Sequence, residues 1–196
     1  MNIKINFKNG NFYKSSGNLI LFVDEKFNIS TLKKHISNTE YSYISDLLKI
    51  KEDKKKIITF DINSKKKIVL ISLKKSIDNS VVENLGAEFC SYLKNSKKSE
   101  YTINSETLPN KSKNLIGYFL HGIKLKSYNF EKYKTKKNEK NITINVIGKN
   151  IPNYKDQQKF NAIEEGTFYT RDLVSEPGNI LHPDEYAKRI KSLKKF

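Results

Sequence analysis

Residues 67–73 read KIVLISL, a run in which apolar side chains follow one another with almost no alternation. A strand of this kind has both faces buried, as happens in the middle of a sheet covered by helices on both sides. The preceding run KIITFDI (56–62) is separated from it by Asn63, Ser64 and Lys65, which are typical of turns. The two runs are therefore predicted to form a close pair of strands in an α/β sheet.

The chain on both sides of this pair supplies further strands and helices. Strands are predicted at 2–7, 18–23, 100–104 and 141–148. Helical or mixed structure is predicted from Ser30 to Lys51, opened by Ser30 or Thr31 as a cap, and amphipathic helices are predicted within 78–96, 112–128 and 157–174. We expect one α/β domain with a mixed sheet of five or six strands covered by helices on both faces, and a C-terminal helix that leads out of it.

Three helical features bear on possible sites. Cys90 lies on the apolar face of its helix and is expected to be a small buried hydrophobe. His121 falls on the side of its helix opposite to the apolar face, near Gly117 and Lys124, so we expect it to be exposed and without a role. In the last predicted helix, the residues expected to pack are Phe160, Ile163, Phe168 and Leu173, and Arg171 is expected to complement the helix dipole.

Composition limits the class of protein. The 196 residues suffice for one well-cored domain and a short appendage. A single cysteine excludes an internal disulfide framework, and the chain contains no C-x-x-C or H-E-x-x-H spacing. The sequence shows neither a signal peptide nor a run of the roughly 20 apolar residues that a membrane span needs. We therefore expect a cytoplasmic protein without a membrane partner.

The net charge of +16 invites a nucleic-acid interpretation, because clustered cations release the counterions of phosphates. Arg171 and Arg189 are the only arginines, however, so the planar group that clamps phosphates or reads guanine is nearly absent. The lysines are better interpreted as a solvated surface, and weak nucleic-acid binding is kept as an alternative.

The end of the chain has the pattern of a joint between two helices. Pro177 and Gly178 stop the outgoing helix, and Pro183 suits the first position of a new one. In this second helix an apolar stripe is formed by Tyr186, Ile190 and Leu193. Such a stripe predicts a packing partner beyond the first domain.

Two segments resemble the leucyl (cytosol) aminopeptidases. RDLVSEPGNILHPDEYA (171–187) is similar to the segment that joins the two domains of these enzymes, and GYFLHGIKLKSYNFEKYKTKK (117–137) is similar to an earlier helix and the stretch after it. The matched positions of the earlier segment are Leu120, Tyr128, Phe130, Tyr133 and Lys134. His182 departs from the family, which usually has threonine there, so a weaker helix cap is expected.

The resemblance implies a domain plan and an activity. Residues 1–152 would be an N-terminal α/β domain, 153–176 an interdomain helix and 177–196 the start of a catalytic domain absent from this chain. The whole enzyme would be a two-metal peptidase that uses Zn²⁺ or Mn²⁺ to remove N-terminal amino acids from peptides, as a homo-hexamer in the cytoplasm. The metal-binding signature of the family does not occur in the sequence, so no catalytic, metal-binding or cofactor-binding residue is assigned here.

The resemblance therefore implies a non-catalytic domain with a role in oligomer assembly and in shaping access to the active site. Its predicted partners are its own catalytic domain, peptides and further copies of itself. Two alternatives stay open: a basic DNA-binding accessory module, and a nucleotide-binding module like the macro domains, whose fold this family's N-terminal domain resembles. The second is disfavoured because the chain has few glycines and no G-x-G-x-x-G.

Overall fold

The computed structural model describes residues 1–8, 17–50, 55–108, 113–135 and 140–193. Its strands form a six-stranded sheet in the order β1-β6-β5-β2-β4-β3, and all neighbours are parallel except the antiparallel pair β3 and β4. The strands are β1 (Asn2–Lys8), β2 (Leu19–Val23), β3 (Ile57–Asp61), β4 (Lys67–Ser72), β5 (Glu100–Asn104) and β6 (Asn141–Ile147). The predicted mixed α/β sheet and the close pair β3–β4 are confirmed.

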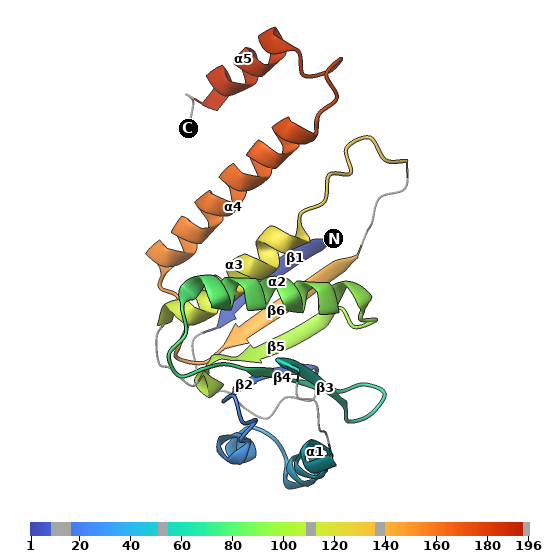
Figure 1. Cartoon of the computed structure of the whole chain (residues 1–196), viewed down its shortest axis with the longest axis vertical. Coiled ribbons are helices and arrows are strands. Elements are labelled where there is room, and N and C mark those ends of the chain that lie inside the picture. Colours follow the sequence, from blue (N-terminus) through green and yellow to red (C-terminus); the bar gives the residue numbers. More distant parts are fainter. Residues whose placement is uncertain (9–16, 51–54, 109–112, 136–139, 194–196) are drawn as a thin grey trace.

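Helices lie on both faces of the sheet (Figure 1). One face carries α2 (Asn79–Asn95) and α3 (Lys113–Ser127), and the other carries the 3-10 helix η1 (Ser30–Lys34) and α1 (Asn38–Ile50). A further 3-10 helix, η2 (Ser105–Thr107), follows β5, and the chain continues into α4 (Tyr154–Ser175) and α5 (Pro183–Ser192). In Figure 1, α5 lies at the end of the molecule opposite to α1.

The alternation of side chains along the central strands divides the core in two. In β2, Ile20 and Phe22 belong to the cluster formed with α2 and α3, whereas Leu19 and Leu21 belong to the cluster formed with η1 and α1. In β4, the four residues at 68–71 are fully buried, as KIVLISL predicts. Burying one such side chain stabilises a fold by about 1.5–3 kcal/mol, so this two-sided burial accounts for the position of β4 inside the sheet.

Helices α2 and α3 cross at very short range. A Cβ atom on Gly86 would collide with the backbone carbonyl of Phe119, and one on Gly122 would collide with the carbonyl of Glu83. The absence of side chains at these two positions therefore lets the helix backbones touch. Cys90 is fully buried, which confirms the expected small buried hydrophobe, and burial raises the pKa of its thiol.

The stretch predicted as mixed structure from Ser30 to Lys51 contains two helices within its described part, up to residue 50. Neither Ser30 nor Thr31 is a cap, because η1 begins at Ser30 with Ile29 at its N-cap position. The cap of α1 is Ser37, whose backbone N–H donates to Glu40 Oε2 (2.9 Å) while its hydroxyl accepts from the Glu40 N–H (3.2 Å). This reciprocal pair is a capping box, whose S-x-x-E signal is present at 37–40 in the sequence. Recognising it would have placed the break between η1 and α1.

Candidate functional site

The two segments that carry the family resemblance are far apart in the sequence but meet in space. After α3, the chain of residues 128–133 lies against the last turn of α4. The Tyr128 hydroxyl donates to Asp172 Oδ1 at 2.7 Å, and Lys132 Nζ lies 2.5 Å from Glu176 Oε1. The resemblance thus maps onto one contact region, at the point where the chain leaves α4.

Glu176 is the centre of this region, in a group of four residues that we call the Glu176 cluster: Glu176, Lys132, Tyr133 and Arg189. Only 1% of the Glu176 side chain is exposed. Its Oε1 accepts from Lys132 and, at 3.0 Å, from Arg189 Nη1 of α5, while its Oε2 accepts from the Tyr133 hydroxyl. One carboxylate therefore links the end of α4, the segment after α3 and the helix α5.

The cluster is electrostatically fixed. Hydrogen bonds from Lys132, Tyr133 and Arg189 lower the pKa of Glu176 to about 2, and the same contacts raise the pKa values of Lys132, Tyr133 and Arg189. A carboxylate with so low a pKa is a poor proton acceptor near neutral pH. The arrangement suits the positioning of helices rather than acid–base chemistry.

A second set of contacts holds α4 to the end of α3. Arg171 Nη1 donates to the Leu125 carbonyl at 2.6 Å, and its guanidinium lies over the Tyr128 ring, 5.5 Å from the centroid. The Phe168 ring of α4 also packs on the Tyr128 ring, and the two ring centroids are 5.4 Å apart. The expectation for Arg171 was wrong: it supplies a cation to the C-terminal turn of α3, not to the dipole of its own helix.

A hollow of about 410 Å³ lies beside the Glu176 cluster. Phe130, Tyr169 and Leu173 line it together with Lys132, Glu176 and Arg189. The surface of this hollow therefore combines apolar and charged side chains between the end of α4 and α5.

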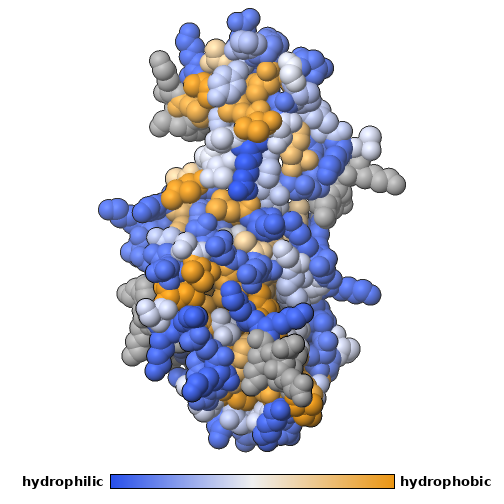
Figure 2. All heavy atoms as spheres, viewed as in Figure 1, coloured by the Kyte–Doolittle hydropathy of each residue, from blue (hydrophilic) through white to orange (hydrophobic). Residues whose placement is uncertain are grey.

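Helix α5 presents the apolar stripe predicted from its spacing. Tyr186, Ile190 and Leu193 are 47%, 41% and 43% exposed, and no residue of α5 within 183–192 is buried. Hydrophobic atoms gather on the part of the surface in Figure 2 that α5 occupies in Figure 1. His182 occupies the N-cap position without a side-chain hydrogen bond, which confirms the weak cap.

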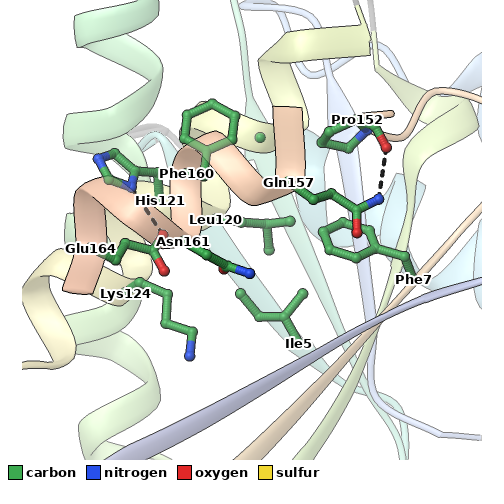
Figure 3. A pocket seen from close by; sticks show the side chains of 11 residues that line it. Ile5, Phe7, Leu120, His121, Lys124, Pro152, Gln157, Phe160, Asn161 and Glu164 are labelled. Atoms are coloured by element: carbon green, nitrogen blue, oxygen red, sulfur yellow. Dashed lines mark hydrogen bonds and ion pairs between the residues drawn. The ribbon is translucent and has the colours of Figure 1, made fainter. Parts of the chain in front are cut away.

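His121 is buried, which contradicts the expectation that it is exposed and without a role. Its ring is 6% exposed, and Nδ1 lies 2.9 Å from Glu164 Oε1 of α4 (Figure 3). The reason is that α4 folds back over the outer side of α3, and Gly117 leaves room for the Phe160 ring beside it. A helical wheel for α3 alone cannot show that a second helix, with a carboxylate in the right register, covers this side.

The same covering corrects the packing face of α4. Phe160 contacts the rings of Tyr118 and His121, Phe168 contacts Tyr128, and Leu173 is buried, as predicted. Ile163 was also predicted to pack, but it is 44% exposed, and the neighbouring Glu164 is buried instead. Glu164 faces His121 of α3, so a polar side chain packs at the point where the apolar pattern predicts Ile163.

The described part of the chain offers neither a metal site nor a membrane-spanning helix. Across these residues, no three side chains of His, Cys, Asp or Glu come together in a way that could hold a metal ion. No described helix is both long and apolar enough to cross a membrane. Residues 131–135 and 140, in the basic stretch before β6, belong to no helix or strand.

Comparisons with known proteins point to one family. No family model matches the chain. It is 27% identical over 205 residues to the probable cytosol aminopeptidase of Rickettsia canadensis, covering 96% of this chain and 41% of that protein. It is 34% identical over 137 residues to the protein of the same name from Phytoplasma mali, covering 66% and 28%, and 37% identical over 80 residues to that of a Bradyrhizobium species, covering 38% and 16%.

The fold agrees with a solved structure. A mutant of tomato leucine aminopeptidase superposes with a TM-score of 0.68 at 17% identity, over 97% of this chain and 42% of that one. The chain thus spans less than half the length of these relatives.

Proposed function

We propose that this chain, which is similar to the N-terminal part of the leucyl (cytosol) aminopeptidases, is the non-catalytic domain of a metal-dependent enzyme that removes N-terminal amino acids from peptides. The observation that supports this role best is the Glu176 cluster. It fixes the direction in which the chain leaves the α/β domain, and it does so with residues from both segments that resemble the family.

The partner of this region is the catalytic domain of the same protein. The stripe of Tyr186, Ile190 and Leu193 is exposed here, and burying each of these side chains against that domain would contribute about 1.5–3 kcal/mol. The hollow beside the Glu176 cluster offers further apolar surface for the same contact. The domain division 1–152, 153–176 and 177–196 belongs to this proposal, with α4 docked on α3 as the interdomain helix.

The chemistry of the proposed enzyme lies in that catalytic domain. Two divalent ions, Mn²⁺ or Zn²⁺, would bind the substrate's amino terminus and activate a water molecule there. The described residues of this chain bring together no donor set for such ions, so no step is assigned to them. A homo-hexamer in the cytoplasm, with this domain contributing to assembly and to access to the active site, completes the proposal.

An activity assay tests the division of labour. The purified 196-residue chain is incubated with a chromogenic leucyl amide and Mn²⁺ or Zn²⁺, and an intact cytosol aminopeptidase is assayed in parallel. We expect turnover by the intact enzyme and none by the chain. Metal-dependent turnover by the chain alone would refute the non-catalytic role.

The DNA-binding alternative has its own test. If the lysines form a solvated surface, duplex DNA should bind no better than roughly 10⁻⁴ to 10⁻⁶ M, with affinity falling steeply as salt rises. Nanomolar binding at physiological salt would favour a DNA-binding module instead.

A further inference from the structure

The connections of β2 and β5 leave the sheet on opposite faces. From β2 the chain passes through η1 and α1 on one face to β3, whereas from β5 it passes through α3 on the other face to β6. Strands β2 and β5 are neighbours and parallel. In open α/β sheets, a crevice forms at the carboxyl ends of two such strands, and ligands bind there preferentially.

The two strands separate early, which opens this crevice. Their ladder contains only the pairs Leu19↔Thr102 and Ile20↔Ile103. Beyond it, the Phe22 N–H donates to the side chain of Thr107, whose hydroxyl in turn donates to the Asn104 carbonyl at 2.8 Å. The Thr107 side chain of η2 thus replaces the missing strand partner, so the backbone N–H of Phe22 in β2 keeps a hydrogen bond where the two strands separate.

A cavity of about 320 Å³ occupies the crevice, a volume within the usual range for small-molecule sites. We call it the switch-point cavity. Its polar and charged lining comes from four separate segments: Asp24 and Asn28 after β2, Thr31, Lys34 and His35 in and after η1, Lys75 after β4, and Glu106 and Thr107 in η2.

The loop after β2 carries backbone strain beside this cavity. Phe27 has φ = 55°, which is unfavourable for a bulky residue. The turn is held by Asp24, whose carbonyl accepts from the Phe27 N–H at 3.0 Å and whose carboxylate accepts from the Asn28 N–H at 2.8 Å. Strained backbone conformations are frequent at ligand-binding sites. Here the strained turn places Asp24 and Asn28 in one wall of the cavity.

The charged lining consists of two lysines, Lys34 and Lys75, and two carboxylates, Asp24 and Glu106. The Asp24 carboxylate accepts from the backbone N–H groups of Lys26 and Asn28 within its turn, which leaves the Glu106 carboxylate to oppose the two lysines. In the described part of the chain, neither Lys34 nor Lys75 forms an ion pair with an acidic side chain, and they approach the cavity from different segments. Burial and the nearby Lys34 lower the pKa of His35, which leaves a polar, uncharged ring in the wall near neutral pH.

We propose that the switch-point cavity binds a small anion bearing a carboxylate or phosphate group, held between Lys34 and Lys75. Lysine binds such groups as a point charge, so no glycine-rich cradle is required. The proposal does not rest on the peptidase role, because the residues that line this cavity are different from those of the Glu176 cluster.

An NMR titration tests the site. The ¹⁵N-labelled chain is titrated with sodium phosphate and, separately, with L-leucine as a carboxylate probe, at constant ionic strength. We expect saturable shifts of the amide signals of Asn28, Thr31 and Thr107 with at least one probe. The probe that binds more tightly identifies which of the two anionic groups the site prefers.

A pair of double variants separates the site from the general positive charge. Lys34→Gln with Lys75→Gln should weaken binding at least fivefold. Lys155→Gln with Lys159→Gln, which removes the same charge from exposed positions on α4, should change it less than twofold. Absence of saturation with both probes, or an equal loss in both variants, would overturn the proposal.

Discussion

The sheet with its covering helices and the α4–α5 extension are stabilised in different ways. In the sheet region, central side chains such as Leu70 and Phe89 are fully buried, and the α2 and α3 backbones touch at two glycines. In the extension, α5 has no buried residue within 183–192 and is held to the rest by Arg189 and Glu176. The first region depends on dense packing, into which added volume fits poorly. In the extension, α4 still packs on the domain through Phe160, Phe168 and Leu173, whereas the docking of α5 depends on a few charged contacts, which can be lost one at a time.

The largest expected effect comes from filling the contact between α2 and α3. Gly86→Ala would place a methyl group on the Phe119 carbonyl, so the helices must separate along a fully buried seam. We expect a loss of about 3 kcal/mol in the free energy of unfolding, at the upper end of the usual cost of overpacking. Urea denaturation followed by circular dichroism measures it.

Gly166→Ala is the matched control in the extension. A Cβ atom at Gly166 meets nothing within 4 Å, and the residue lies inside the helix α4. The same chemical change should therefore raise stability by about 0.5–1 kcal/mol, because alanine favours a helix. If both variants were equally destabilised, the proposed contrast between a packed and an open region would be wrong.

The next effect concerns the seam where the two regions meet. Glu164→Ala would leave the buried His121 ring without its partner, which should cost about 2 kcal/mol in the free energy of unfolding. The exposed neighbour Glu165 provides the control, since Glu165→Ala should lie within about 0.5 kcal/mol of the parent chain. Equal stability of the two variants, measured in urea, would show that the pair does not hold α4 to α3.

This seam also shows where sequence reasoning stops. The unbroken apolar run at 67–73 predicts a central strand because two-sided burial is a local property of the sequence. The pairing of His121 with Glu164 depends on the path of the chain between them, and neither residue signals it locally. The capping box at Ser37 and Glu40 is an intermediate case, since its spacing was readable in the sequence.

For the Glu176 cluster the limit is similar. The family resemblance identifies the two segments, but it does not show that Lys132 and Tyr133 converge on Glu176. Lysine-rich stretches usually form solvated surface, and the carboxylate lies more than forty residues away in the sequence. Local spacing therefore identifies elements, whereas contacts between elements require the fold.

A smaller and more local effect is expected in the extension itself. Glu176→Ala removes the acceptor shared by Lys132, Tyr133 and Arg189, so α5 should detach while the sheet region keeps its stability. Hydrogen exchange of the α5 amides should accelerate, with exchange in β4 unchanged. Glu185→Ala is the control: Glu185 also pairs with Arg189, but within α5, so its loss should leave the helix docked.

The pH dependence of this docking follows from the pKa of Glu176. Because the pKa falls from its ordinary value of 4.5 to about 2 in the folded chain, the contribution of the carboxylate is complete above about pH 4.5 and is lost as the pH falls toward 2. Protection of α5 should be constant between pH 5 and 8. A loss of α5 protection within that range would mean that another group controls the docking.

The smallest effect is expected at His182, the N-cap residue that precedes α5. His182 is the N-cap of α5 but forms no side-chain hydrogen bond there, and Glu185 lies three positions later. His182→Thr would complete a T-x-x-E pattern, in which the hydroxyl accepts from the N–H of Glu185 and the carboxylate reaches the N–H at the cap. The gain in helix stability should be about 0.5–1 kcal/mol, and it should be confined to α5 because no residue of this helix is buried.

Hydrogen exchange measures this gain. Amide exchange in 184–190 should slow by roughly two- to fivefold, since 1.4 kcal/mol corresponds to a factor of ten. His182→Ala serves as the comparison, because it also removes the imidazole but offers no acceptor. If both variants slowed exchange equally, the effect would come from loss of the ring, and the cap would have no part in holding α5 together.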